Sequence, residues 1–154
     1  MSKFDDHPNV RTAVRYHEAV SRFAGPEELA SFLHPDLVHT QLPNTLFPTG
    51  TVRDLSEVVA ASKQGGEMLA HQHFEVTGAV ASGDRVALEA TWFGTLAVPL
   101  GGLPAGHVLR AHVAAFLDFR DGRIVAQRNY DCYEPVRSEP PGEGARPGSE
   151  ADPA

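Results

Sequence analysis

The feature that most constrains the fold is a long hairpin from His107 to Tyr133, whose two strands meet at the turn Asp121-Gly122. Asp-Gly between two runs of alternating residues is the strongest short-range signal for a hairpin, and a two-residue turn fixes the register. Counting back from the turn places His112 opposite Asp131. Opposed residues share one face of the sheet, with Cβ atoms roughly 4.5–5.5 Å apart. The register therefore predicts a catalytic acid/base pair, unless a β-bulge turns one partner to the other face.

The composition of the chain indicates a single globular domain followed by a disordered tail. The chain has 154 residues, of which 42% are hydrophobic, and this predicts one domain with its own core over residues 1–136. The tail, 137–154, is rich in Pro, Gly and Glu and is expected to be disordered. Because the net charge is −7 and the basic residues are scattered, we expect no nucleic-acid or membrane partner.

Other classes are excluded by what the sequence lacks. No apolar run approaches the ~20 residues that span a bilayer, and the first residues do not resemble a signal peptide, so a cytoplasmic location is expected. Cys132 is the single cysteine, so the chain can form neither an internal disulfide nor a thiolate metal site.

The order of the expected elements predicts an α+β fold, with helices on one face of a curved antiparallel sheet and a pocket between the layers. Apolar spacing and capping residues predict helices over Val10–Ala24, Glu27–Leu33 and Asp54–Gly65. Alternation predicts strands over Leu37–Leu42, Leu69–Ala81 and Arg85–Val98, ahead of the long hairpin. The Gly- and Pro-rich segment Pro99–Gly106 is interpreted as a lid.

Two motifs carry a resemblance to a known family. Gly94-Thr95 followed by Gly102-Leu103-Pro104-Ala105-Gly106 is similar to a Gly-Thr … Gly-(Ile/Leu)-Pro-Pro-Thr-Gly loop, and Asp121-Gly122-Arg123-Ile124-Val125 to an Asp-Gly-Lys-Ile hairpin. From Val10 to Pro135 the chain thus resembles the SnoaL-like polyketide cyclases of the nuclear transport factor 2-like superfamily. The resemblance implies a cone-shaped fold in which a curved antiparallel sheet packs on three N-terminal helices and encloses a pocket.

The resemblance also implies a range of activities, because cyclases, dehydratases, ketosteroid isomerases and limonene epoxide hydrolases share this fold. SnoaL-like enzymes work through a pocket aspartate with a histidine nearby and need no metal or organic cofactor. Asp131 and His112 supply these residue types. We therefore expect a cofactor-independent cyclase, isomerase or lyase that acts by acid/base chemistry on an apolar oxygenated substrate, such as a polyketide or terpenoid. The alternative is a non-catalytic domain that binds a small ligand or dimerises.

The sequence matches the catalytic residue patterns of two related enzymes, limonene epoxide hydrolase and ketosteroid isomerase, less well. The long middle strand carries Ala90-Thr91-Trp92 where limonene epoxide hydrolase has Arg-x-Asp, and Cys132 aligns with the last-strand aspartate of that enzyme. Epoxide hydrolysis is therefore the less favoured reaction. The first strand lacks the carboxylate that serves ketosteroid isomerase as base, although Tyr16 can act as a phenol donor.

We expect polar and aromatic side chains from the first helix and several strands to contact the substrate. These candidates are Tyr16, His17, His39, Gln41, Trp92, Phe116 and Asn129. Asn129 lies two residues before Asp131 and is suited to donate a hydrogen bond to a substrate oxygen. Burial by Trp92, Phe116 and the lid would raise the pKa of the Asp131 carboxyl toward working pH.

The outer face of the sheet is the expected partner surface. Apolar residues on expected strands suggest a self-complementary patch for a homodimer. They are Phe74, Val76, Val113 and Leu117.

Overall fold

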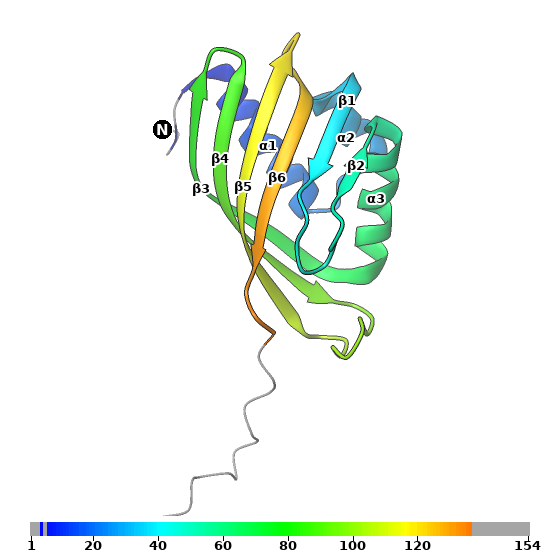
Figure 1. Ribbon diagram of the computed structural model, residues 1–154. Coiled ribbons are helices and arrows are strands. Elements are labelled where there is room, and N and C mark those ends of the chain that lie inside the picture. The colour runs from blue at the N-terminus through cyan, green and yellow to red at the C-terminus, as the bar shows by residue number, and fades with distance from the viewer. Residues whose placement is uncertain (1–3, 5, 137–154) are drawn as a thin grey trace, which may run out of the picture.

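Three helices cover one face of a strongly curved, six-stranded sheet (Figure 1). The computed structural model describes residue 4 and residues 6–136, so the predicted tail, 137–154, lies outside the described residues. The helices are α1 (Pro8–Ser21), α2 (Pro26–Phe32) and α3 (Leu55–Met68). The strands are β1 (Leu33–Gln41), β2 (Thr51–Arg53), β3 (Leu69–Ser82), β4 (Arg85–Leu96), β5 (Val108–Arg120) and β6 (Arg123–Tyr133). The α+β architecture predicted from the sequence is confirmed.

The sheet is mixed rather than wholly antiparallel. Its strand order is β2-β1-β6-β5-β4-β3, and every neighbouring pair is antiparallel except β1 and β6. Parallel neighbours need a long crossover, and here α3 and four strands separate β1 from β6 in the chain. This pairing places Gln41 of β1 beside Asn129 of β6 and so brings two distant polar segments together.

The register predicted for the β5–β6 hairpin is wrong beyond its first pairs. Asp121 and Gly122 form the expected turn, with positive φ values of 52° and 74°, and Phe119 pairs with Ile124. Asp118, however, pairs with Ala126, which leaves Val125 as the extra residue of a β-bulge.

The bulge changes which residues of β6 face the helices. From Asp118 back to Ala111 every pair is shifted by one, so His112 lies opposite Cys132 and Asp131 lies opposite Val113. Because the side-chain period of a strand is two, a shift of one residue moves a side chain to the other face. Asp131 therefore faces the helix layer, whereas His112 faces away from it.

The helices begin and pack largely as their sequences predict. The Asp54 side chain accepts a hydrogen bond from the backbone of Glu57, whose side chain accepts one from the backbone of Asp54, which completes a capping box. Helix α3 continues through Gly65 and Gly66 to Met68, three residues beyond the predicted end. Helix α1 turns a buried stripe that includes Val10, Ala13, Tyr16 and His17 toward the inner face of the sheet.

The connection from β4 to β5 is a compact turn. Leu100 and Leu103 exchange backbone hydrogen bonds of 3.0 and 2.9 Å and pack against the core. Among the described residues, no helix combines the length and the apolar character that crossing a bilayer requires.

Candidate active site

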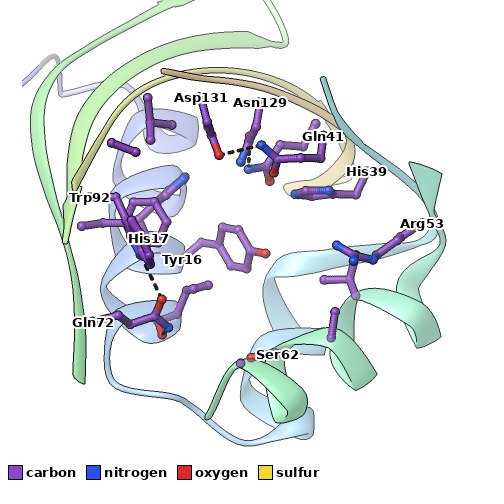
Figure 2. Close-up of a pocket in the computed structure, with 18 of the residues that line it drawn as sticks. Tyr16, His17, His39, Gln41, Arg53, Ser62, Gln72, Trp92, Asn129 and Asp131 are labelled. Atoms are coloured by element: carbon purple, nitrogen blue, oxygen red, sulfur yellow. Dashed lines mark hydrogen bonds between the residues drawn. The ribbon is translucent and has the colours of Figure 1, made fainter. Parts of the chain in front are cut away.

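A cavity of about 230 Å³ lies between the inner face of the sheet and helices α1 and α3 (Figure 2). Its walls combine apolar side chains with an unusual number of polar ones. The polar and aromatic residues that line it are Tyr16, His17, His39, Gln41, Arg53, Ser62, Gln72, Phe74, Trp92, Gln127, Asn129, Asp131 and Tyr133. A small concave site with a few converging polar groups is the usual form of a small-molecule binding site.

Asp131 is the one carboxylate among the described residues that line this cavity. Its Oδ2 accepts a hydrogen bond of 2.6 Å from Nε2 of Gln41, and its Oδ1 is buried without a hydrogen-bond partner. Burial raises the pKa of the Asp131 carboxyl, and the Gln41 hydrogen bond opposes part of that rise. A carboxylate that is fixed at one oxygen and unsatisfied at the other is suited to accept a proton.

Asn129 lies on the same face of β6 and has a fixed orientation. Its Oδ1 accepts a hydrogen bond of 2.9 Å from Nε2 of Gln127, so its Nδ2 is turned away from Gln127. Within residues 6–136, that Nδ2 donates to no other group. The buried Oε1 of Gln127 likewise has no partner. Asn129 thus offers free N–H groups beside Asp131 (Figure 2).

Helix α1 contributes Tyr16 and His17. Burial raises the pKa of Tyr16 to about 12, so its phenol is neutral and its O–H is a donor at ordinary pH. Nδ1 of His17 lies 2.8 Å from the carbonyl oxygen of Ala13; because a carbonyl only accepts, this nitrogen carries the proton. Burial lowers the pKa of His17, which leaves a neutral imidazole with Nε2 as an acceptor.

His39 and Arg53 face the cavity from two adjacent strands. They are paired across β1 and β2, and Nδ1 of His39 is buried without a partner. Burial, with a smaller effect from the charge of Arg53, lowers the pKa of His39 to about 4. His39 is therefore neutral at physiological pH.

Trp92 forms one wall, and its polar atom is already satisfied. Its Nε1 donates to Oε1 of Gln72 at 3.1 Å, while Nε2 of Gln72 donates to the carbonyl of Val20 at 2.8 Å. The indole also lies over Gly94, where a Cβ would come within 2.4 Å of the ring. This close approach accounts for the glycine of the Gly94-Thr95 motif. Trp92 thus shapes the cavity and has no free donor for a substrate.

Most of the residues predicted to contact substrate line the cavity, and two predicted residues do not. His112 projects from the outer face, where its Nε2 lies 3.1 Å from Oε1 of Glu134 and its side chain is 55% exposed. Phe116 also lies on the outer face, with its ring 5.9 Å from that of Tyr130. The bulge at Val125 explains the failure of the His112–Asp131 pairing. Phe116 is excluded by strand alternation, because Ala115 and Leu117 are the buried neighbours.

Two further expectations concern the loop after β4 and the outer face of the sheet. Residues 99–106 are not among the described residues that line the cavity, and the interpretation of this segment as a lid stays a prediction. The patch expected on the outer face lies on the inner face instead, since Val113 and Leu117 are buried in the core and Phe74 lines the cavity. The expected homodimer itself stays a prediction.

Five polar lining residues were not anticipated, namely Arg53, Ser62, Gln72, Gln127 and Tyr133. Gln127 and Tyr133 have a signal in the sequence, because they alternate with Asn129 and Asp131 along one strand. Arg53 sits on a three-residue strand whose pairing with β1 depends on a loop, so no local pattern indicates its position.

The chain has structural relatives over most of its length. It matches IdmH, a proposed polyketide cyclase from Streptomyces antibioticus, with 25% identity and a TM-score of 0.69 over 81% of this chain and 92% of that one. AclR, a proposed hydroxylase from Streptomyces galilaeus, matches with 22% identity and a TM-score of 0.65 over 80% of this chain and 77% of that one.

A nuclear transport factor 2-like protein from Burkholderia pseudomallei K96243 matches with 20% identity and a TM-score of 0.66 over 80% of this chain and 90% of that one. These likenesses confirm the nuclear transport factor 2-like fold. No curated protein matches the chain.

A family model described as the SnoaL-like domain matches residues 13–127, which is most of the chain and contains both motifs noted in the sequence. The chain belongs to the SnoaL-like family.

Proposed function

We propose that this protein is a cofactor-independent enzyme that transfers a proton at the carbon next to a carbonyl group, as an aldol-type cyclase, isomerase or lyase does. The observation that carries the proposal is the Asp131 carboxylate, which faces a small cavity with mixed apolar and polar walls and has one oxygen held by Gln41 and the other unsatisfied. Burial raises the pKa of this group, and a stronger base at working pH is what such a reaction requires.

The proposed reaction begins when Asp131 removes the proton. The C–H electron pair moves into the carbonyl, and negative charge develops on its oxygen. Asn129 has free N–H groups on the same face and would donate a hydrogen bond to that oxygen, where charge accumulates in the transition state. The enolate then attacks a second carbonyl in a cyclisation or regains a proton at another carbon in an isomerisation. In either case the protonated Asp131 returns its proton and is regenerated.

The family relationship supports this class of chemistry. IdmH is described as a proposed polyketide cyclase, whereas AclR, on the same fold, is described as a proposed hydroxylase. The fold alone therefore does not select a reaction, and the proposal depends on the polar groups in the cavity. Five of the polar residues predicted from the sequence line this one cavity, namely Tyr16, His17, His39, Asn129 and Asp131. Their convergence favours catalysis over simple ligand binding.

Exchange of α-protons tests the proposal without knowledge of the natural substrate. 2-Tetralone, an apolar bicyclic ketone, is incubated with protein in D₂O, and loss of its α-proton signals is followed by NMR. We expect exchange above the buffer rate with the natural chain and at least a 100-fold smaller enzymatic rate with Asp131→Asn. Asparagine keeps the volume and one acceptor for Gln41 but cannot take the proton. Absence of catalysed exchange, or full exchange with the variant, would contradict the proposal.

A further inference from the structure

Arg53 is a cation inside the cavity without a counter-ion. Its guanidinium lines the cavity and lies 5.7 Å from the ring centroid of Phe47, and among residues 6–136 it has no ion pair. The one described carboxylate in the lining, Asp131, forms no ion pair with Arg53 and is hydrogen-bonded to Gln41 instead. The Arg53 guanidinium and the Asp131 carboxylate thus lie at separate places in one cavity (Figure 2).

A second free donor faces this cation. Figure 2 shows the phenol of Tyr16 and the guanidinium of Arg53 pointing toward one another across the cavity. The hydroxyl of Tyr16 makes no hydrogen bond within the part of the chain that the structure describes. Tyr16 lies on α1 and Arg53 on β2, so packing of the helices against the sheet brings the two donors together.

A carboxylate would satisfy both groups at once. The planar guanidinium offers parallel N–H donors that match the two oxygens of a carboxylate, and such charged hydrogen bonds are about twice as strong as neutral ones. The cavity between the two ends is lined by apolar side chains that include Leu29, Val58 and Ala61. These would contact a hydrocarbon body.

We infer that the cavity binds carboxylic acids, with the carboxylate on Arg53 and Tyr16 and the apolar body extending toward Asp131 and Asn129. The inference rests on the proposed function in that it assigns the substrate of the same site as an oxo-carboxylic acid. The carboxylate would fix which carbon of the substrate lies beside the base.

An isosteric pair of probes isolates the charge. We would measure the dissociation constants of 4-phenylbutyrate and of its neutral amide, 4-phenylbutyramide, at pH 7.5. The readouts are titration calorimetry and the fluorescence of Trp92, the single tryptophan, whose ring lines the cavity. The natural chain should bind the acid at least tenfold more tightly than the amide.

Variants of Arg53 and Tyr16 test whether these two residues cause the preference for the acid over the amide. Arg53→Gln should abolish the preference for the acid, Arg53→Lys should keep part of it, and Tyr16→Phe should weaken acid binding about threefold. Arg110→Gln is the matched control, because Arg110 also stacks on a phenylalanine, Phe93, but lies on the outer face beside Glu134. It removes the same net charge and should leave both dissociation constants unchanged.

Each other result overturns the inference. Equal affinity for acid and amide, binding of neither probe, or a preference that survives Arg53→Gln would each show that the cavity does not recognise a carboxylate. The proposed function is tested independently, because 2-tetralone has no carboxylate and binding constants require no turnover. Either proposal can therefore fail while the other stands.

Discussion

Nε2 of Gln41 donates a 2.6 Å hydrogen bond to Oδ2 of Asp131, although 90 residues separate the two in the chain. The contact exists because β1 runs parallel to β6 and pairs Gln41 with Asn129, two residues from Asp131. Two structural features, the crossover and the bulge at Val125, are both required to bring the amide and the carboxylate to one place. The site is thus a product of the topology as much as of its residues.

Removal of the Gln41 amide should change the pH dependence of the reaction. The hydrogen bond favours the charged form of Asp131, so Gln41→Leu should raise the pKa of that carboxyl further. The acidic limb of the rate profile for 2-tetralone exchange should then move to higher pH, with a smaller change in the rate at high pH. A limb that stays in place would show that Gln41 does not tune the base.

Gln72 should contribute to stability rather than to chemistry. Its amide accepts from the Trp92 indole and donates to the carbonyl of Val20, which also accepts from the backbone of Phe23. Gln72→Leu would therefore leave the buried indole N–H unpaired and remove one of the hydrogen bonds to Val20. We expect a loss of about 1–3 kcal/mol in the free energy of unfolding, measured by urea denaturation. Gln64→Leu, at an exposed position of α3, is the control and should change stability by less than ~0.5 kcal/mol. Equal effects of the two substitutions would refute this role.

The buried neutral His39 predicts a specific loss of stability in acid. Its pKa is about 4 in the folded chain and near 6.5 when unfolded, so between these values the unfolded state binds more protons. The natural chain should therefore lose stability relative to His39→Gln as pH falls from 6.5 to 4, and the difference should level off below that range. A difference on the order of 1–3 kcal/mol is expected from unfolding curves at each pH. Parallel curves across the range would show that His39 titrates normally.

The outer face of the sheet presents a different apolar pair from the one expected. The rings of Phe116 and Tyr130 meet edge to face, and the residues are 37% and 46% exposed. If a homodimer forms through this face, light scattering should give twice the 16.6 kDa chain mass, and Phe116→Glu should reduce it to one chain. Met68→Glu, at the similarly exposed end of α3, should not. A monomeric natural chain would exclude the dimer.

The sequence predicts those features that depend on local chemistry. The capping box at Asp54, the Asp121-Gly122 turn and the alternation of β4 all have signals within a few residues, and each is present in the structure. The bulge has no such signal, because Val125 is an ordinary strand residue without a glycine or proline beside it. The extra residue Val125 shifts β6 by one position relative to β5, so Asp131 and His112 face opposite sides of the sheet. Asn129 and Asp131 stay on one face because both lie on the same side of the bulge.

The position of Arg53 shows a second limit of sequence reasoning. Strand β2 pairs with β1 through residues 39–41, and this places Arg53 opposite His39. That register is set by the loop between the strands, where the αL conformation of Gly50, with φ of 68°, allows a close approach to the carbonyl of Gln41. Such a contact is decided by tertiary structure and is not visible in any periodic pattern.

Asp131 lies inside the cavity, where we propose that it acts as the base, whereas His112 lies outside it. The most direct test compares the α-proton exchange of 2-tetralone by the natural chain, Asp131→Asn and His112→Asn under one set of conditions. We expect at least a 100-fold loss for Asp131→Asn and a rate within twofold of the natural chain for His112→Asn. Comparable losses for the two variants would contradict this expectation, because they would show that the imidazole and the carboxylate act as one pair.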